Sequence, residues 1–143
     1  MINVAAAIIV KNGKVFIAQR PVHKFPPLKW EFPGGKQEPG ETLPQTLHRE
    51  LNEELKIDAT IGEFFMRTTH TYDKGTIEMS CYFASVPEQT VIISNEHAAT
   101  AWVTPQEMSN YDFADADKLV VAALQALHSG VRSDLALGVQ PRV

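Results

Sequence analysis

The chain has 143 residues, of which 44% are hydrophobic and 21% charged. This size and composition are those of one globular domain and exclude wholesale disorder. Thirteen basic and 17 acidic residues give a net charge of −4, which disfavours a protein that wraps a nucleic acid polymer electrostatically. The charge is uneven, because residues 1–36 sum to +5 and the remaining residues to −9.

The cysteine content and the length of the apolar runs indicate the cellular compartment in which the protein resides. The lone cysteine, Cys81, forms no internal disulfide, so an oxidising compartment is not implied. The longest apolar run, Val4–Val10, is too short to cross a bilayer and lacks the basic start of a secretory signal. We therefore expect a cytoplasmic protein with no membrane partner.

Two short strands begin the predicted secondary structure. Apolar and β-rich residues fill Val4–Val10 and Val15–Gln19, and the Asn-Gly pair between them suits the positive φ angles of a type I′ hairpin turn. Residues 21–40 are rich in proline and glycine, so we expect a loop there apart from a short run at Trp30–Phe32.

A helix with clear start signals follows. Thr42 and Gln45 form a T-x-x-Q capping box, and Pro44 suits the first turn. The helix should end near Leu55 to Lys56. Leucines recur every four residues and predict one apolar stripe against a core, namely Leu43, Leu47, Leu51 and Leu55.

The second half of the sequence predicts further strands and a second helix. We expect strands at Phe64–Tyr72 and Thr76–Ala84, with Cys81 on the core side of the latter. The remaining expected elements are strands at Thr90–Ile93 and Ala99–Val103, a helical turn at Pro105–Met108 and a helix at Asp115–Leu127. This order predicts one α+β domain with mixed sheets over residues 1–129 and a C-terminal tail over residues 130–143, whose role is open.

The strongest chemical signal lies on the first predicted helix. Glu50, Glu53 and Glu54 stand at i, i+3 and i+4, so their carboxylates share one side while the leucine stripe points elsewhere. Like charges at this spacing destabilise a helix by roughly 0.2–0.5 kcal/mol per pair. One interpretation is a solvated acidic face. The other is a site for Mg²⁺, which prefers oxygen ligands and is typically bound by a few carboxylates together with substrate phosphates.

The surrounding segment, GGKQEPGETLPQTLHRELNEEL, resembles the Nudix box, G-x5-E-x7-R-E-U-x-E-E-x-G-U, where U is a bulky aliphatic residue. Gly35 opens the box, Glu41 follows after five residues, and Arg49 follows after seven more. Lys56 stands where the box has glycine, which leaves the local helix cap in question. Outside the box, the resemblance to the MutT-type branch covers about residues 3–128, through segments at 6–9, 18–21, 30–36, 96–102 and 114–117.

The resemblance implies a Nudix fold, with mixed β-sheets sandwiched between helices (α/β/α). It also implies hydrolysis of a nucleoside triphosphate to the monophosphate and pyrophosphate with Mg²⁺ or Mn²⁺. The expected substrates are (d)CTP or modified and damaged nucleotides, in nucleotide-pool sanitation and DNA repair. The alternatives are 8-oxo-dGTP, another diphosphate such as a nucleotide sugar, and a Nudix-like module that binds a nucleotide without cleaving it. A monomer and a homodimer are both compatible with the sequence.

By the same resemblance, the metal ligands are the Gly34 carbonyl, Glu50, Glu53, Glu54 and Glu96. Glu50 is also the general-base candidate, directly or through a metal-bound water, and Glu53 and Glu96 join it as catalytic residues. Arg49 would orient the glutamates, because its planar fork binds a carboxylate bidentately. Glu41 either supports Arg49 or is a plain acid at the helix entry. For Glu96, the alternatives are a further metal, assistance to the base, or a solvated loop acid.

The implied substrate contacts are Arg20, Glu31, Phe32, Pro33, Gly34 and Asp117. Arg20 would pair with the triphosphate or hydrogen-bond the base, or lie on the surface, and Phe32 would line the base pocket or belong to the core. Asp117 stands where MutT-type enzymes selective for oxidised guanine have asparagine. An ionised aspartate only accepts hydrogen bonds, which suits the exocyclic amino group of cytosine. A helix-entry acid is the alternative for Asp117, and Asp115 is a rival for its role.

Overall fold

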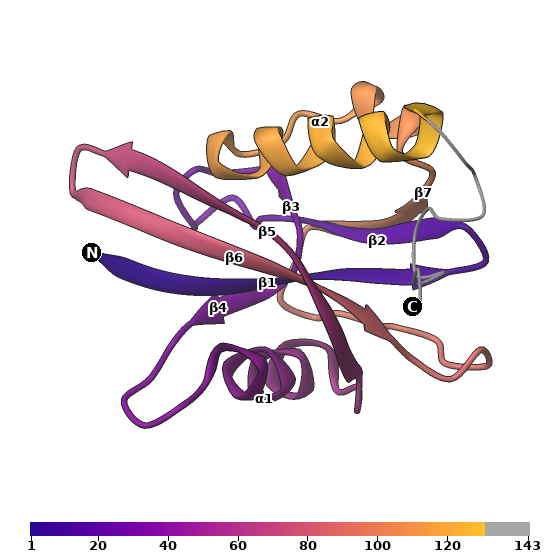
Figure 1. Ribbon diagram of the computed structural model, residues 1–143, viewed down its shortest axis with the longest axis horizontal. Coiled ribbons are helices and arrows are strands. Elements are labelled where there is room, and N and C mark those ends of the chain that lie inside the picture. Colours follow the sequence, from indigo (N-terminus) through magenta and orange to yellow (C-terminus); the bar gives the residue numbers. More distant parts are fainter. Residues whose placement is uncertain (131–143) are drawn as a thin grey trace.

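A mixed β-sheet lies at the centre of the fold, in a computed structural model that describes residues 1–130, with side chains through residue 127 (Figure 1). The strands are β1 (Ile2–Lys11), β2 (Lys14–Gln19), β3 (Trp30–Glu31), β4 (Gly34–Lys36), β5 (Thr60–Tyr72), β6 (Gly75–Ser85) and β7 (Ala99–Val103). The helices are α1 (Leu43–Leu55), the short 3₁₀ helix η1 (Gln106–Asn110) and α2 (Asp115–Gly130). The expected tail, apart from Gly130 in α2, lies outside the described residues.

β1 organises the sheet. It pairs in parallel with β6 and antiparallel with β4 and β2, while β5 pairs antiparallel with β6. β2 also pairs antiparallel with β3 and β7. The parallel pairing of β1 with β6 makes the sheet mixed, as the sequence predicted.

The sheet is covered on both faces, by α1 on one and α2 on the other (Figure 1). Alternate residues of β1 belong to different core clusters, with Ala7 and Ile9 on the α1 side and Ala6 and Ile8 on the α2 side. Burial on both faces explains why β1 is a continuous apolar run instead of an alternating one. The residues that α1 and α2 add to these clusters include Leu47, Leu51 and Leu55 from α1, and Val120 and Leu124 from α2. This arrangement confirms the α/β/α expectation.

The predicted hairpin of β1 and β2 forms, and β5 and β6 form a second one. Asn12 and Gly13 have φ angles of 55° and 77°, as a type I′ turn requires. β5 and β6 pair from Tyr72 opposite Gly75 to Thr60 opposite Ser85, so both strands extend beyond the predicted ranges. Cys81 is fully buried in β6, as expected. Neither α1 nor α2, the long helices among residues 1–130, has the length and apolar character needed to span a bilayer.

Two expectations from local sequence are wrong. The predicted strand at Thr90–Ile93 does not form, and only Ile92 of its apolar residues is buried, while Val91 and Ile93 are exposed. The segment is rich in β-branched residues, but it pairs with no strand of the described sheet. Conversely, the expected loop contains β4, whose glycines have low strand propensity but lie against β1.

Candidate functional site

Helix α1 carries the glutamates and is capped at both ends. The Thr42 hydroxyl accepts from the Gln45 N–H at 3.2 Å, and the Gln45 side chain accepts from the Thr42 N–H at 2.9 Å. At the other end Lys56 adopts the left-handed conformation, with φ 57° and ψ 38°, and its N–H donates to the Asn52 carbonyl. Lys56 therefore forms the cap for which the Nudix box has glycine, and its Nζ donates to the Glu53 carbonyl at 2.9 Å.

Strand β4 brings two glycines against the helix and against β1. A Cβ atom at Gly34 would overlap the Ala5 carbonyl oxygen, and one at Gly35 would overlap the carboxyl group of Glu50. A side chain at Gly34 would therefore collide with backbone, whereas one at Gly35 would collide with the end of the Glu50 side chain, whose carboxyl group packs directly on the β4 backbone. The Pro33 carbonyl accepts from the Ala7 N–H at 2.8 Å and joins the β3–β4 segment to β1.

Arg49 is held by a bidentate ion pair with Glu41. Its Nε and Nη2 donate to the two carboxylate oxygens of Glu41 at 2.6 and 3.0 Å, and Nη2 also donates to the Lys36 carbonyl. The Thr46 hydroxyl donates to Glu41 at 2.7 Å from a fully buried position. The hydrogen bond from Arg49, with those from the Glu38 backbone and Thr46, lowers the pKa of Glu41 to about 2. Glu41 thus supports Arg49, the first of the two roles considered for it.

The remaining nitrogen of the Arg49 fork lies between two of the glutamates. Nη1 donates to Glu50 at 3.0 Å and to Glu53 at 3.3 Å. The hydrogen bond to Glu41 is the largest influence that raises the pKa of Arg49, so the guanidinium remains charged. Arg49 therefore donates to two carboxylates of the helix.

Glu54 lies in the most acidic environment of the site. Burial, the charge of Glu50 and a hydrogen bond between the two carboxyl groups raise the pKa of Glu54 to about 9, and Glu31 and Glu96 add to this effect. The charges of Glu31 and Glu96 therefore lie within electrostatic reach of α1, although both residues are distant in sequence. A cation bound among these carboxylates would lower their pKa values and allow them to ionise together.

The donors at this site are carboxylate and backbone carbonyl oxygens, which fit a hard divalent cation such as Mg²⁺. Among the described residues, no three His, Cys, Asp or Glu side chains already surround one point as metal ligands. In the observed rotamers one carboxylate oxygen of Glu50 and one of Glu53 accept from Arg49. The donor chemistry of the site therefore fits the implied metal.

Arg20 and Glu31, both expected to contact substrate, pair with each other. Arg20 Nη1 donates to Glu31 at 2.7 Å, and Nη2 donates to the Phe25 carbonyl at 2.8 Å. The His97 ring lies 3.8 Å from the other Glu31 oxygen and is held by Ser94 at 2.7 Å. Arg20 therefore lies inside a hydrogen-bonded network and not free on the surface.

Phe32 lies against Asp117, a residue of the first turn of α2. The Phe32 N–H donates to Asp117 Oδ1 at 3.1 Å, and both side chains are almost fully buried. Burial raises the pKa of Asp117 to about 8, so its carboxyl group is mostly protonated at neutral pH. The ionised form used in the sequence argument for cytosine is therefore not the favoured form. Asp115, its rival, is exposed and pairs with Lys118.

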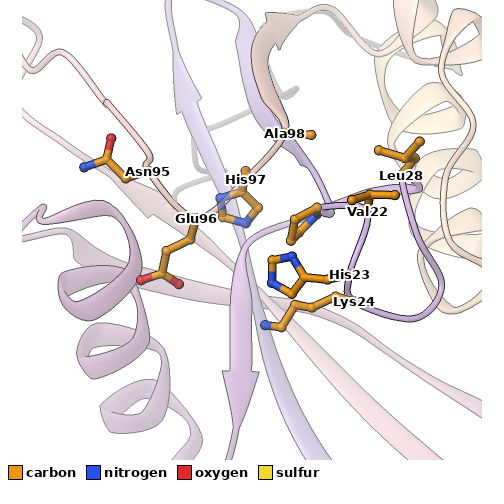
Figure 2. Close-up of a pocket in the computed structure, with 9 residues that line it drawn as sticks. Val22, His23, Lys24, Leu28, Asn95, Glu96, His97 and Ala98 are labelled. Atoms are coloured by element: carbon orange, nitrogen blue, oxygen red, sulfur yellow. The ribbon is translucent and has the colours of Figure 1, made fainter.

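Glu96 and His97 line a pocket of about 550 Å³ with the loop that follows β2 (Figure 2). Sequence reasoning placed Glu96 near the site but missed the opposite wall, which includes His23 and Lys24. It also missed Thr46, which a helix-stripe argument treats as an ordinary polar residue. The pocket wall depends on a contact between segments distant in sequence, whereas the Thr46 contact with Glu41 spans only five residues at the start of α1.

Comparisons with known proteins identify the family of this chain. A family model described as the NUDIX domain matches residues 1–124. CTP pyrophosphohydrolase from Escherichia coli (strain K12) is 38% identical over 135 residues, which are 94% of this chain and 98% of that protein. An 8-oxo-dGTP diphosphatase from Proteus vulgaris is 40% identical over 85 residues, covering 59% of this chain and 76% of that protein.

Solved structures give the same result. The solution structure of the E. coli ORF135 protein superposes with a TM-score of 0.79 at 38% identity, covering 94% of this chain and 95% of that one. A MutT structure from the study of Aliivibrio salmonicida and Vibrio cholerae has a TM-score of 0.67 at 32% identity, with coverage of 85% and 94%. The chain belongs to the Nudix family, a family of hydrolases that depend on a divalent metal.

Proposed function

We propose that the protein is a Mg²⁺-dependent nucleoside triphosphate pyrophosphohydrolase that acts on (d)CTP or on modified or damaged nucleotides. The observation that carries this proposal is the packing of Glu50 against Gly35 of β4, with Glu54 hydrogen-bonded to Glu50. Carboxylates concentrated in this way bind a divalent cation, which in turn binds phosphate oxygens and offsets the charge of phosphoryl transfer. The named relative from E. coli supports a cytosine nucleotide as substrate.

The proposed metal ligands are the Gly34 carbonyl, Glu50, Glu53, Glu54 and Glu96. Glu50 is proposed as the general base, directly or through a bound water, because its carboxyl group is fixed between β4 and Arg49. Arg49 acts as a positioning residue, since its guanidinium orients Glu50 and Glu53. Mn²⁺ suits the same oxygen donors.

The proposed substrate contacts are Arg20, Glu31, Phe32, Pro33, Gly34 and Asp117. The Arg20–Glu31 pair lies beside His97 at the edge of the pocket, where it reaches the triphosphate or the base. Phe32 and Asp117 form the more enclosed part of this region. A cytoplasmic role in nucleotide-pool sanitation and DNA repair, with neither a nucleic acid polymer nor a membrane as partner, follows from this assignment.

One observation favours a second candidate, 8-oxo-dGTP. Protonated Asp117 offers a donor as well as an acceptor, as asparagine does, and this is the hydrogen-bonding capacity associated above with oxidised guanine. Relatives named 8-oxo-dGTP diphosphatase support the same candidate.

Pyrophosphate release with Mg²⁺, measured across CTP, dCTP, 8-oxo-dGTP and a nucleotide sugar, tests the proposal. We expect the specificity constant to be highest for a cytosine nucleotide. A clear preference for 8-oxo-dGTP would overturn the assignment of a cytosine nucleotide as substrate, but it would leave the proposed pyrophosphohydrolase reaction intact. Failure to cleave any nucleoside triphosphate would contradict the reaction itself.

A further inference from the structure

The pocket of about 550 Å³ lies where two strand ends meet. β2 and β7 pair antiparallel with Gln19 opposite Ala99, so the loop leaving β2 and the loop entering β7 begin side by side. The Ala98 N–H donates to the Gln19 carbonyl at 2.9 Å and fixes this junction. The pocket is therefore lined by two loops, residues 21–28 and residues 95–98.

Opposite charges line the two walls of this pocket. Glu96 extends from one loop, while the side chains of His23 and Lys24 extend from the other toward the same space (Figure 2). Among the ion pairs formed by the described side chains, none includes Lys24. The Lys24 ammonium is thus a cation that lines the pocket without an acidic partner there.

The acidic wall connects the pocket to the glutamates of α1. Glu96 lines this pocket and is also one of the proposed metal ligands. A phosphate chain that binds a cation at Glu96 would therefore have the side chains of His23 and Lys24 beside it, because all three residues surround the same space (Figure 2).

The loop that carries Lys24 is fixed at several points. The Lys24 N–H donates to the Pro21 carbonyl, and Arg20 donates to the Phe25 carbonyl at 2.8 Å. The Gln19 side chain donates to the Leu28 carbonyl at 3.0 Å. These contacts limit the ordering cost that binding would otherwise impose on the loop. The guanidinium of Arg20 binds Glu31 and the Phe25 carbonyl. Among the residues that line the pocket, Lys24 is the one with a lysine or arginine side chain.

We propose that Lys24, assisted by His23, binds the terminal phosphates of the substrate and retains the pyrophosphate leaving group in this pocket. The inference rests on the proposed function and deepens it. It assigns a binding site to the β- and γ-phosphates, which a triphosphate has and a monophosphate lacks. An ammonium group on a phosphate supplies charge-assisted hydrogen bonds, and losing one typically costs about tenfold in affinity.

The test compares Lys24→Met with Lys14→Met as the matched control. Lys14 is an exposed lysine at the opposite end of β2, so its substitution makes the same charge change away from the pocket. Calorimetry with Mg²⁺ measures the binding of inorganic pyrophosphate and, separately, of CMP. Steady-state kinetics with CTP then measures kcat and KM for the same proteins.

We expect Lys24→Met to weaken pyrophosphate binding about tenfold and to raise KM for CTP by a similar factor, with kcat and CMP binding close to the wild type. Lys14→Met should match the wild type. Equal pyrophosphate affinity in wild type and Lys24→Met would overturn the inference, as would an equal loss of CMP affinity, which would assign the pocket to the nucleoside. Because pyrophosphate binding needs no turnover, this comparison decides the inference even if the wild type cleaves no nucleotide.

Discussion

Arg49 and its partners show how single residues arrange the carboxylates of α1. The arginine uses two nitrogens for Glu41 and a third for Glu50 and Glu53, so one planar group fixes three acids. Lysine has no such fork and would contact fewer of these acids at once. Orientation of the glutamates therefore depends on the shape of the Arg49 side chain as well as on its charge.

Lys56 shows that the glycine of the Nudix box is not essential for the helix cap. A non-glycine residue in the left-handed region costs roughly 1–2 kcal/mol. The lysine backbone nevertheless makes the expected bond to Asn52, and its side chain adds a bond to Glu53. At the position of Lys56 the motif alone did not settle how the helix ends, and the structure shows a left-handed cap.

Asp117 predicts a pH dependence of stability. Its pKa is about 8 in the folded protein against 3.8 for an unperturbed aspartate, so the folded state retains the proton. The associated stabilisation is full below about pH 4 and is lost as the pH rises from about 4 to about 8. Asp117→Asn removes this titration while keeping an acceptor for the Phe32 N–H.

Urea unfolding at pH 6, 7, 8 and 9 checks this prediction. The free energy of unfolding of Asp117→Asn should exceed that of the wild type by a margin that grows from pH 6 to pH 8 and then levels, reaching on the order of a few kcal/mol. Asp115→Asn is the control, because Asp115 is exposed on the same helix turn. Parallel stability curves for the wild type and Asp117→Asn would contradict a buried, protonated Asp117.

At the scale of elements, β4 determines how closely the sheet approaches α1. A methyl group at Gly34 meets the β1 backbone, whereas one at Gly35 meets the end of the Glu50 side chain. Backbone cannot move aside without breaking strand pairing, but a glutamate side chain can. We therefore expect Gly34→Ala to lower stability by about 2 kcal/mol or more, through forced packing.

Gly35→Ala should separate activity from folding. We expect turnover to fall by roughly tenfold or more, because the Glu50 carboxyl group is displaced, with a smaller loss of stability than in Gly34→Ala. Turnover and urea unfolding of the two variants, measured side by side, check both expectations. A Gly35→Ala protein with wild-type turnover would show that the contact between β4 and Glu50 is not needed.

Helix α1 was predictable from sequence and β4 was not, for physical reasons. The capping box and the leucine stripe are local signals, and both operate in the structure. The strand β4 consists of two glycines and a lysine, and it forms because its backbone pairs with β1. The segment at Thr90–Ile93 shows the reverse case, in which β-branched residues find no partner strand.

Across the whole molecule, the sheet separates two cores with different relations to the site. Leu51 belongs to the cluster under α1, and Leu124 to the cluster under α2, and both are fully buried. Leu→Ala at either position should cost about 2–5 kcal/mol. The two losses should add within about 0.5 kcal/mol, because the residues share no packing partners.

Activity should distinguish these two variants. Leu51→Ala loosens the helix that carries the glutamates, so its turnover should fall more than that of Leu124→Ala under conditions where both are folded. Turnover and urea unfolding of the single and double variants check this. A larger loss of turnover in Leu124→Ala would mean that the α2 side contributes more to the chemistry than the α1 side.

Much of the candidate site was readable from spacing on one helix, and the rest was not. The positions of Glu50, Glu53 and Glu54 follow from helical periodicity. The approach of Glu31 and Glu96 to Glu54 depends on β2 pairing with both β3 and β7, which no local pattern specifies. Arg20 and Lys24 both belong to the basic first 36 residues, but only the structure separates a paired Arg20 from a pocket-lining Lys24.

The turnover of Glu53→Gln with CTP and Mg²⁺ tests the central claim most directly. Glu53 is exposed and its removal leaves both cores intact, so the fold should survive. We predict that turnover falls by roughly 100-fold or more, while the exposed control Glu63→Gln stays near the wild type. An unchanged rate for Glu53→Gln would contradict the assignment of the α1 glutamates as the metal-binding, catalytic group.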